Sequence, residues 1–451
     1  MIKRALFTVA AILACFGMHA QKNILNNSTK QDIEEYFAKS ISNEEAIPFD
    51  CKKKIPVKRA GEACIEVWNC WKNIIKKSEK EKLPPLSATI NPDTLFWSMP
   101  THPEEGAQMP FYYVYKGEKP TEGYPLFLYM HGSGPKNREW ETGLKLCNTF
   151  DDAPSAYFIP QIPSEKHYRW AVQHQQLAWE KLLRLALTNN DINPERIYFF
   201  GISEGGYGSQ RLASFYADYL AGAGPMAGGE PLKNAPAENL ANTAFILRTG
   251  EHDYGFGRNY MTYLTGATLD SLRTAHPGLY NFYVELIPKM GHNFDYRGTT
   301  TWLAKYKRNP NPTYYYWEDY DMYGRHRKGF YNIRVNETSR NNDEERTCYE
   351  VTTEANRINI NVKNVTYTTT ETKMGIPMVF SKSYAPATKG NITLFLNDKL
   401  ADLTKPIEVI VNGKTAFSGK VKPTVKAMAE SCALFFDPAR VFPVAIEVVI
   451  E

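Results

Sequence analysis

The sequence predicts an α/β fold with a mostly parallel sheet and helices on both faces, followed by an antiparallel, sandwich-like β region. Between residues 95 and 310, short apolar runs alternate with amphipathic segments, which is the pattern of successive strand–helix units. After residue 310 the helical spacing stops and alternating β patterns follow one another. At 451 residues the chain exceeds one ordinary core, so we expect two or three structural units.

Residues 1–20 have the three parts of a secretory signal: basic residues, an apolar run and a small residue, Ala20, suited to cleavage. The apolar run is too short to span a bilayer, and no later segment is apolar enough to do so. A second interpretation is a lipoprotein signal, in which Ile-Leu-Ala precedes an acylated Cys15. We therefore expect an exported protein, periplasmic or extracellular, without a transmembrane segment.

Residues 21–94 are expected to form a helical accessory region. Apolar residues recur at helical spacing in residues 31–40 and 63–80, with a polar connector between them. Pro84 and Pro85 end the second helix, because proline cannot donate a helical hydrogen bond. This region carries no recognisable chemistry.

The α/β region, residues 95–310, is expected to alternate strands with helices. We place strands near residues 112, 127, 157, 198, 223, 246 and 284, and helices near residues 172–188, 204–219, 258–274 and 298–308. Trp179 falls on the apolar face of the first of these helices, so we expect it in the core. Open sheets of this kind carry their sites at the carboxyl ends of the strands.

The most informative motif is the sequence G-I-S-E-G at residues 201–205, which directly follows an apolar run. A G-x-S-x-G sequence between a buried strand and a helix places its serine in a sharp, strained turn. Glycines at both ends remove the Cβ atoms that would clash there. The motif therefore makes Ser203 the candidate nucleophile, although such residues also form ordinary strand-to-helix connections.

A nucleophilic serine needs a base to remove its proton, and the base needs an acid to hold its tautomer. Asp253 and His292 each lie just past the end of a strand-like segment, so we expect both at the same sheet edge as Ser203. Their order along the chain, serine then acid then histidine, is the one that this architecture uses. Glu251 is a competing acid, but it directly abuts the glycine that ends its strand.

The sequence H-G-S-G at residues 131–134 follows another apolar strand and is the candidate oxyanion loop. Attack on a carbonyl creates a negative oxygen, which backbone amide hydrogens can stabilise. We expect one donor to be the amide of Glu204, the residue after the nucleophile, and the other to come from Ser133 or Gly134. His131 is expected to have a role other than that of the base.

These motifs resemble those of the α/β-hydrolase superfamily, and more closely those of secreted bacterial esterases of the dienelactone-hydrolase, polyhydroxybutyrate-depolymerase and prolyl-oligopeptidase-like type. The resemblance covers approximately residues 95–310 and rests on the segments 129–135, 198–208, 250–253 and 291–292. It implies a triad of Ser203, Asp253 and His292, with no cofactor. It names no substrate, because one fold hosts many chemistries.

Residues 311–451 are expected to form a β-rich domain. Strand patterns occur at residues 331–335, 348–353, 358–362, 392–396, 407–411 and 444–450. Asn412-Gly413 is a strong hairpin signal, and the aromatic run at 314–317 is expected to pack this domain onto the α/β region. Stretches between residues 391 and 421 resemble the C-terminal β domain appended to many secreted bacterial esterases.

Two tryptophans are candidate substrate-binding residues. Trp170 follows a predicted strand at the edge that carries the triad, and Trp140 lies in the loop beyond the oxyanion segment. Either could stack on a sugar or an aromatic acyl group, or could simply anchor its loop.

Charge and cysteine content exclude several classes of partner. The net charge of +4 is small for this length and both signs are interspersed, so we infer neither a nucleic-acid partner nor an anionic membrane surface. The cysteine spacings match no zinc site. In an oxidising compartment some cysteines should pair, with Cys51, Cys64 and Cys70 as natural candidates.

The function that the sequence favours is that of a secreted serine hydrolase acting on a small-molecule or polysaccharide-linked ester, such as an acyl or feruloyl ester on plant polysaccharide. A serine peptidase of the prolyl-oligopeptidase-like type is the alternative within the same chemistry. An alternative of another class is a non-catalytic glycan-binding protein. The oligomeric state is left open.

Overall fold

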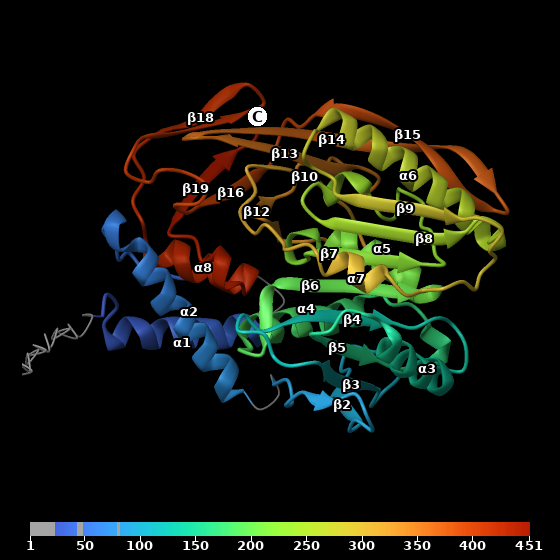
Figure 1. Ribbon diagram of the computed structural model, residues 1–451. Helices are drawn as coiled ribbons and strands as arrows, with labels where there is room; N and C mark the ends of the chain where they lie inside the picture. The colour runs from blue at the N-terminus through green and yellow to red at the C-terminus, as the bar shows by residue number, and fades with distance from the viewer. Residues whose placement is uncertain (1–22, 43–47, 79–81) are drawn as a thin grey trace, which may run out of the picture.

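The computed structural model describes residues 23–42, 48–78 and 82–451 (Figure 1). The predicted secretory signal at residues 1–20 and the alternative acylation site Cys15 lie outside the described residues. Within them, no helix combines the length and the hydropathy that a membrane crossing requires. The predicted fold class is confirmed: one mostly parallel sheet carries helices, and two further sheets follow it along the chain.

The central sheet has nine strands in the order β1-β3-β5-β4-β6-β7-β8-β9, with β2 paired to β3. Neighbours from β5 to β9 run parallel, whereas β3 is antiparallel to both β2 and β5. The strands are β1 (Ser87–Ala88), β2 (Leu95–Ser98), β3 (Gln108–Lys116), β4 (Tyr124–Met130), β5 (Ser155–Pro160), β6 (Ile192–Ile202), β7 (Gly222–Met226), β8 (Ala244–Gly250) and β9 (Phe282–Ile287).

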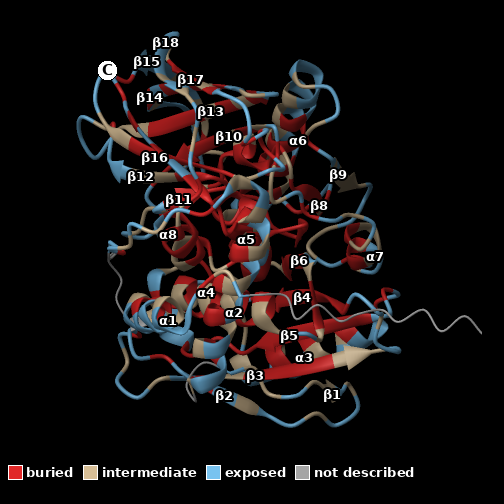
Figure 2. Cartoon of the chain, turned by 90° about the vertical axis from the view of Figure 1, so that its left-hand side faces the viewer, coloured by how far each residue is buried: buried red, intermediate tan, exposed pale blue. Residues whose placement is uncertain are grey.

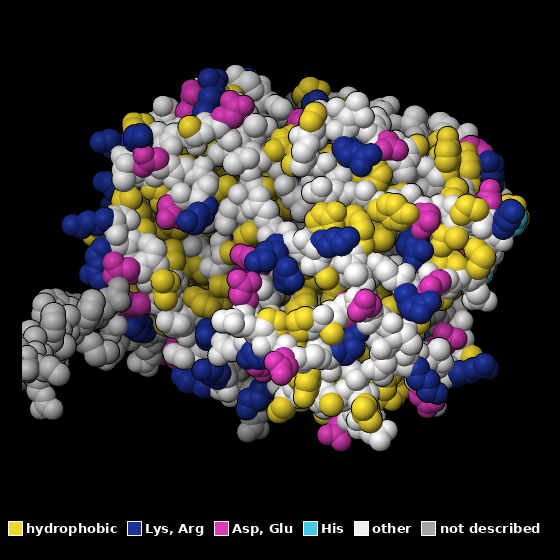
Figure 3. All heavy atoms as spheres, in the orientation of Figure 1, with side chains coloured by type: hydrophobic (Ala, Val, Ile, Leu, Met, Phe, Trp, Pro, Cys, Tyr) yellow, Lys and Arg dark blue, Asp and Glu magenta, His cyan; other side chains and the backbone are white. Residues whose placement is uncertain are grey.

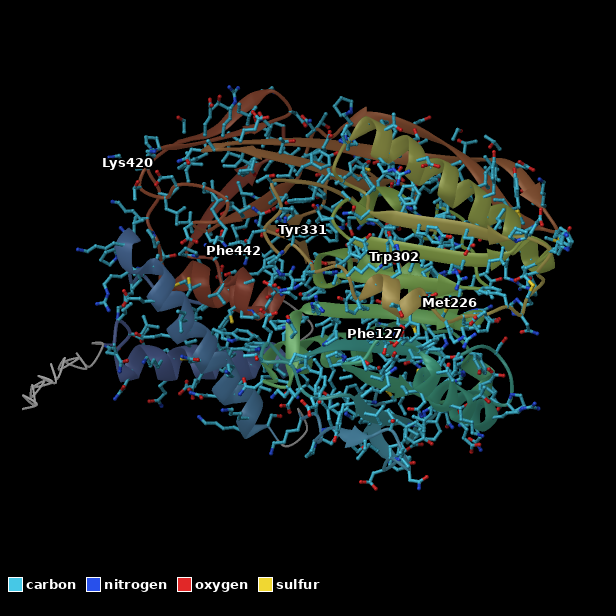
Figure 4. All side chains as sticks on the ribbon, in the orientation of Figure 1. Phe127, Met226, Trp302, Tyr331, Lys420 and Phe442 are labelled. Atoms are coloured by element: carbon cyan, nitrogen blue, oxygen red, sulfur yellow. The ribbon has the colours of Figure 1, made fainter. Side chains whose placement is uncertain are left out.

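Helices cover the two faces of this sheet. The helices of this region are α3 (Lys136–Thr149), α4 (Gln173–Thr188), α5 (Glu204–Phe215), α6 (Arg258–Ala275) and α7 (Thr299–Leu303). Alternate residues of β4 point to opposite faces, as strand geometry requires. Leu128 shares a core with Trp179 of α4, as predicted, whereas Phe127 shares one with Cys147 of α3. Figure 4 shows Phe127 within the central sheet.

Two expected features of this region differ from the structure. Trp140 was expected in a loop, but it lies in helix α3, whose polar sequence conceals buried residues at positions 140, 143 and 147. The last helix, α7, is shorter than the predicted range of residues 298–308.

The N-terminal helices α1 (Asn27–Ser42) and α2 (Ala60–Lys77) pack against α8 (Val425–Phe435) from the other end of the chain. Helix α8 was not expected, because the surrounding sequence is rich in strand patterns. Thr424 caps it by accepting a hydrogen bond from the Ala427 amide at 3.1 Å. Segments far apart in the sequence thus contribute to one buried core (Figure 2, buried residues in red).

The strands after residue 310 form two sheets. The six-stranded sheet holds β10 (Tyr314–Asp319), β13 (Arg346–Glu354), β14 (Arg357–Lys373), β15 (Ile376–Pro386), β17 (Ile407–Val411) and β18 (Lys414–Gly419). The four-stranded sheet holds β11 (Gly329–Phe330), β12 (Ile333–Glu337), β16 (Asn391–Leu396) and β19 (Val444–Val449). The predicted hairpin is confirmed: Asn412 and Gly413, with φ of 48° and 81°, join β17 to β18.

The cysteines do not pair as expected. All six among the described residues are free thiols. Cys64 and Cys70 lie six residues apart on α2, about 9 Å along its axis at the rise of an α-helix. That separation exceeds the Cα distance that a disulfide spans. Burial raises the pKa of the Cys64 thiol to about 12, so this side chain behaves as a small apolar group.

Candidate active site

Ser203 is the single residue between strand β6 and helix α5. Its backbone is strained, with φ of 55° and ψ of −112°. The flanking glycines are required by close packing rather than by their own dihedrals. A Cβ on Gly205 would lie 1.9 Å from the carbonyl oxygen of Met130, and one on Gly201 would lie 2.5 Å from the same atom. The predicted strand–turn–helix context of the G-x-S-x-G motif is therefore present in the structure.

The structure brings the three predicted side chains together in one hydrogen-bonded chain. His292 Nε2 lies 3.1 Å from Ser203 Oγ, and His292 Nδ1 lies 2.7 Å from Asp253 Oδ2. Asp253 comes from the loop after β8, and His292 from the loop after β9. The Asp253 side chain is buried, whereas the imidazole of His292 is 37% exposed, so solvent reaches the middle of the chain.

The competing acid, Glu251, lies elsewhere. Its side chain is half exposed, and its Oε2 accepts a hydrogen bond from the Lys289 amide at 2.9 Å. The ring of His252 is its neighbour, with Nε2 3.8 Å from Glu251 Oε2. Glu251 therefore anchors the turn before His292, while Asp253 contacts the imidazole itself.

Arg258 holds the second carboxylate oxygen of Asp253. Its Nε and Nη2 donate to Asp253 Oδ1 at 2.9 and 2.6 Å. Burial alone would raise the pKa of Asp253, but the hydrogen bonds from His292 and Arg258 outweigh it and hold the pKa below its ordinary value. The sequence offered no pattern that singles out Arg258, because an arginine in the first turn of a helix is common.

Hydrogen bonds to the Gly132 carbonyl fix the orientation of the peptide group between Gly132 and Ser133. Gly132 lies against the nucleophile, since a Cβ there would be 3.3 Å from Ser203 Cβ. The Gly132 carbonyl accepts hydrogen bonds from Tyr168 Oη at 2.6 Å and from His131 Nδ1 at 2.8 Å. In a planar trans peptide the N–H points opposite to the C=O, so these bonds aim the Ser133 amide away from Tyr168.

His131 is neutral and has a structural role. It was expected not to be the catalytic base. The ring is fully buried, and burial lowers its pKa to about 4. Its Nε2 accepts a hydrogen bond from the Ile162 amide at 3.1 Å, which assigns the ring hydrogen to Nδ1. His131 thereby donates to the Gly132 carbonyl and has no free nitrogen with which to act as a base.

The other expected amide donors differ in their surroundings. Glu204 is the first residue of α5, where backbone N–H groups have no partner within the helix. Its side chain is turned toward Arg169, which donates to the carboxylate at 2.6 Å. Gly134 is crowded, because a Cβ there would lie 2.5 Å from Glu139 Oε1. The expected oxyanion donors, the amide of Glu204 together with that of Ser133 or Gly134, stay a prediction.

The two tryptophans do not lie in an open site. Trp170 is fully buried beneath α5, where its Cβ approaches Gly208, and its indole donates to the His131 carbonyl at 2.9 Å. Trp140 is also buried, stacked on Tyr112 at 4.0 Å between ring centroids. Stacking on a substrate needs an exposed indole face, so the expected substrate-binding role of both residues is corrected to a packing role.

A large cavity lies apart from Ser203. Its volume is about 1270 Å³, and it opens among α1, α2, α4 and the segment before β11. The residues that line it include Tyr36, Trp71, His174 and Arg325, but not Ser203, Asp253 or His292.

No family model matches the chain, and no curated protein matches it. Among solved structures, one described as a thermostable esterase is 21% identical over 48% of this chain and 64% of its own, with a TM-score of 0.38. Est1E from Butyrivibrio proteoclasticus is 13% identical over 47% of this chain and 96% of its own, with a TM-score of 0.34. A ferulic acid esterase is 13% identical over 47% of this chain and 93% of its own, with a TM-score of 0.34. Likeness at this level concerns the fold alone, so the chemistry of this chain rests on the site itself.

Proposed function

We propose that this protein is a serine hydrolase that cleaves carboxylic esters through Ser203, His292 and Asp253. The observation that carries the proposal is the continuous hydrogen-bonded chain from Ser203 Oγ through the imidazole to Asp253 Oδ2. The strained backbone of Ser203 supports it, because strain of this kind concentrates at functional sites.

The proposed reaction has two halves, acylation of Ser203 and hydrolysis of the acyl-enzyme, and His292 takes and returns a proton in each. Ser203 Oγ attacks the ester carbonyl while His292 Nε2 takes the hydroxyl proton, and a tetrahedral oxyanion forms. The intermediate collapses to an acyl-enzyme as His292 gives its proton to the leaving alcohol. Water then attacks the acyl-enzyme by the same route and releases the acid. Asp253 holds Nδ1 protonated and stabilises the imidazolium in both halves.

The amides of Glu204 and Ser133 are the proposed donors to the oxyanion. Each such donor contributes about 3 kcal/mol of transition-state stabilisation in enzymes of this type. The Glu204 amide adds the positive end of helix α5, which favours negative charge at this place.

We also propose a role for each region of the chain. Residues 95–310 would be the catalytic unit, since all of these groups come from it. Residues 21–94 and 311–451 would be accessory. Residues 1–20 would direct export. On that basis we propose that the substrates are acyl or feruloyl esters on plant polysaccharide.

The test is hydrolysis of soluble p-nitrophenyl acetate, butyrate and feruloyl esters beside a panel of peptide amides. We expect the esters to be cleaved, with kcat falling at least about a thousand-fold in Ser203→Ala and in His292→Ala. Preferential cleavage of the amides would favour the peptidase alternative. Binding of glycans without cleavage of any ester or amide would favour the glycan-binding alternative.

A further inference from the structure

A carboxylate that the proposed reaction does not use lies against the candidate oxyanion loop. Glu139 stands in the first turn of α3, and its side chain contacts the loop at residues 131–134. A Cβ on Gly134 would lie 2.5 Å from Glu139 Oε1 and 3.0 Å from Glu139 Cδ. A Cβ on Gly132 would lie 3.4 Å from Glu139 Oε2 and 3.3 Å from Ser203 Cβ. The two glycines of the loop therefore leave the space that the carboxyl group occupies, next to the nucleophile.

The charge of this carboxylate also acts on the loop that holds the proposed base. Burial, followed by the charges of Asp253 and Glu139, raises the pKa of Tyr296 to about 12. The Tyr296 hydroxyl in turn donates to the His292 carbonyl at 3.0 Å. Glu139 is therefore close to both sides of the proposed reaction centre, the candidate oxyanion loop and the loop of His292.

The Glu139 carboxylate has no hydrogen-bond or salt-bridge partner among the described residues. Its side chain is half-buried, and burial raises its pKa, which the charge of Arg138 offsets only in part. Neither carboxylate oxygen is sealed from solvent, so a ligand can reach both. Removing part of the water from an unpaired carboxylate costs free energy, and groups of this kind concentrate at functional sites.

A structural role at the start of α3 does not account for Glu139. Acidic side chains near a helix start often accept hydrogen bonds from the first backbone amides, which have no partner within the helix. Here the amide of Lys136, the first residue of α3, donates to Glu165 from the segment after β5, at 2.7 Å. Glu165 therefore serves the start of the helix, and Glu139 is left facing the candidate oxyanion loop.

The chemistry of the group limits what it can bind. An ionised carboxylate only accepts hydrogen bonds, so its ligand has to donate them. The charge of Arg138 acts on the same carboxylate and disfavours a cationic ligand such as an ammonium group. Over the face of the described residues that Figure 3 shows, acidic and basic side chains are interspersed, so this face offers no broad negative surface to attract a cation. A neutral hydroxyl is the donor that these surroundings favour.

We propose that Glu139 accepts a hydrogen bond from a sugar hydroxyl near the ester bond and thereby selects esters of polyhydroxylated alcohols. This inference rests on the proposed function and deepens it, because it names the residue that recognises the sugar. In a sugar ester, free hydroxyls stand on carbon atoms close to the esterified oxygen. A hydrogen bond from such a hydroxyl to an ionised carboxylate is about twice as strong as one between neutral groups. An alcohol without the hydroxyl would leave the half-buried carboxylate unpaired, so the site would reject it.

The test compares two esters that differ only in these hydroxyls. One is a feruloyl ester of methyl arabinofuranoside with its ring hydroxyls free, and the other has hydrogen in place of those hydroxyls. We expect kcat/KM of the full chain to be about ten-fold higher or more for the hydroxylated ester. Glu139→Ala should reduce this preference to about two-fold or less, and Glu139→Gln, which keeps an acceptor oxygen without the charge, should have an intermediate preference. Both variants should lose less on p-nitrophenyl acetate, which carries no hydroxyl, than on the hydroxylated ester.

Glu141→Ala is the matched control, because Glu141 is an exposed acid on the same helix. It should keep the preference of the unsubstituted chain. A binding measurement makes the test independent of the chemistry. In the full chain carrying Ser203→Ala, the hydroxylated ester should bind more tightly than the deoxygenated one, and adding Glu139→Ala should remove this difference.

Three results would overturn the proposal: no difference in binding between the two esters, a preference that survives in Glu139→Ala, or equal losses on the hydroxylated ester and p-nitrophenyl acetate. The last of these would show that Glu139 supports the candidate oxyanion loop rather than a sugar hydroxyl. Hydroxyl-dependent binding through Glu139 by a chain that cleaves no ester would contradict the proposed function alone.

Discussion

Asp253 accepts hydrogen bonds on both carboxylate oxygens, one from His292 and two from Arg258. Its folded-state pKa lies below its ordinary value of about 3.9. The ionised carboxylate therefore adds stability that is complete above that value and is lost as the pH falls through the lower folded-state value. Arg258 contributes to both the orientation and the charge of the proposed triad.

Replacing Arg258 by Gln should raise the folded-state pKa of Asp253, so acid unfolding should begin at a higher pH. It should also lower kcat/KM at neutral pH by about ten-fold, because Asp253 loses the partner that orients it. Far-UV circular dichroism across acidic pH and ester kinetics check both effects. Arg273→Gln is the control, since its pair with Asp270 is exposed and contributes little. An unchanged acid-unfolding midpoint in Arg258→Gln would contradict the account.

We expect Tyr168 to act on the reaction through its hydrogen bond to the Gly132 peptide. Tyr168→Phe removes the 2.6 Å hydrogen bond to that carbonyl and leaves the bond from His131. We expect kcat to fall about ten-fold with KM nearly constant, which is less than the loss of an oxyanion donor itself. Tyr124→Phe removes an equivalent hydroxyl-to-carbonyl bond, to Gly117 at 3.0 Å, and should leave kcat unchanged. A rise in KM without a change in kcat would indicate that Tyr168 binds substrate instead.

At the scale of elements, the junction of β4, β6 and α5 depends on glycine. Gly205→Ala would place a Cβ 1.9 Å from the Met130 carbonyl oxygen, and the backbone atoms there cannot move aside cheaply. We expect the free energy of unfolding to fall by about 3 kcal/mol or more, measured by denaturant titration. Gly61→Ala in α2 meets nothing within 4 Å and should raise stability by about 0.5–1 kcal/mol. Equal effects of the two substitutions would refute this packing argument.

Elements whose signals are local could be predicted from the sequence. The turn at Ser203 and the hairpin at Asn412 each depend on a few adjacent residues, and both are present. Helices α3 and α8 were missed, since α3 is largely polar and α8 lies among strand patterns.

Contacts set by tertiary structure could not be predicted in the same way. Trp170 follows β5 at the expected edge, but its side chain turns beneath α5, and sequence position does not give that direction. Tyr168 was missed as a site residue because its partner, the Gly132 carbonyl, lies in another loop. Arg258 lies only five residues after its partner Asp253, but no motif marks an arginine at that position.

At the scale of the whole molecule, a buried ionic network joins the central sheet region to the β region. Arg440 donates to Asp218 at 2.5 Å and to Asp437 at 2.7 Å, and Arg308 donates to Asp437 at 2.6 Å. Burial alone would raise the pKa of Asp437, but Arg308 and Arg440 hold it well below its ordinary range. Asp218 belongs to the central sheet region and Asp437 to the β region. The ion pairs that Arg440 makes with both carboxylates therefore couple these two halves of the chain.

Arg440→Met would leave two buried carboxylates without one of their cations. We expect a loss of about 3–5 kcal/mol in the free energy of unfolding, with both halves unfolding in one transition. Denaturant titration followed separately by tryptophan fluorescence and far-UV circular dichroism checks this. Two separate transitions in the unsubstituted protein would show that the halves fold independently.

The most direct test of the central claim is covalent labelling with a fluorophosphonate, followed by mapping of the labelled peptide by mass spectrometry. An activated serine attacks the phosphorus, displaces fluoride and loses its proton to the histidine. We therefore expect one label per chain, on Ser203, with no label in Ser203→Ala and at least about a hundred-fold slower labelling in His292→Ala. An unlabelled protein, or a label on a different serine that persists in Ser203→Ala, would contradict the account.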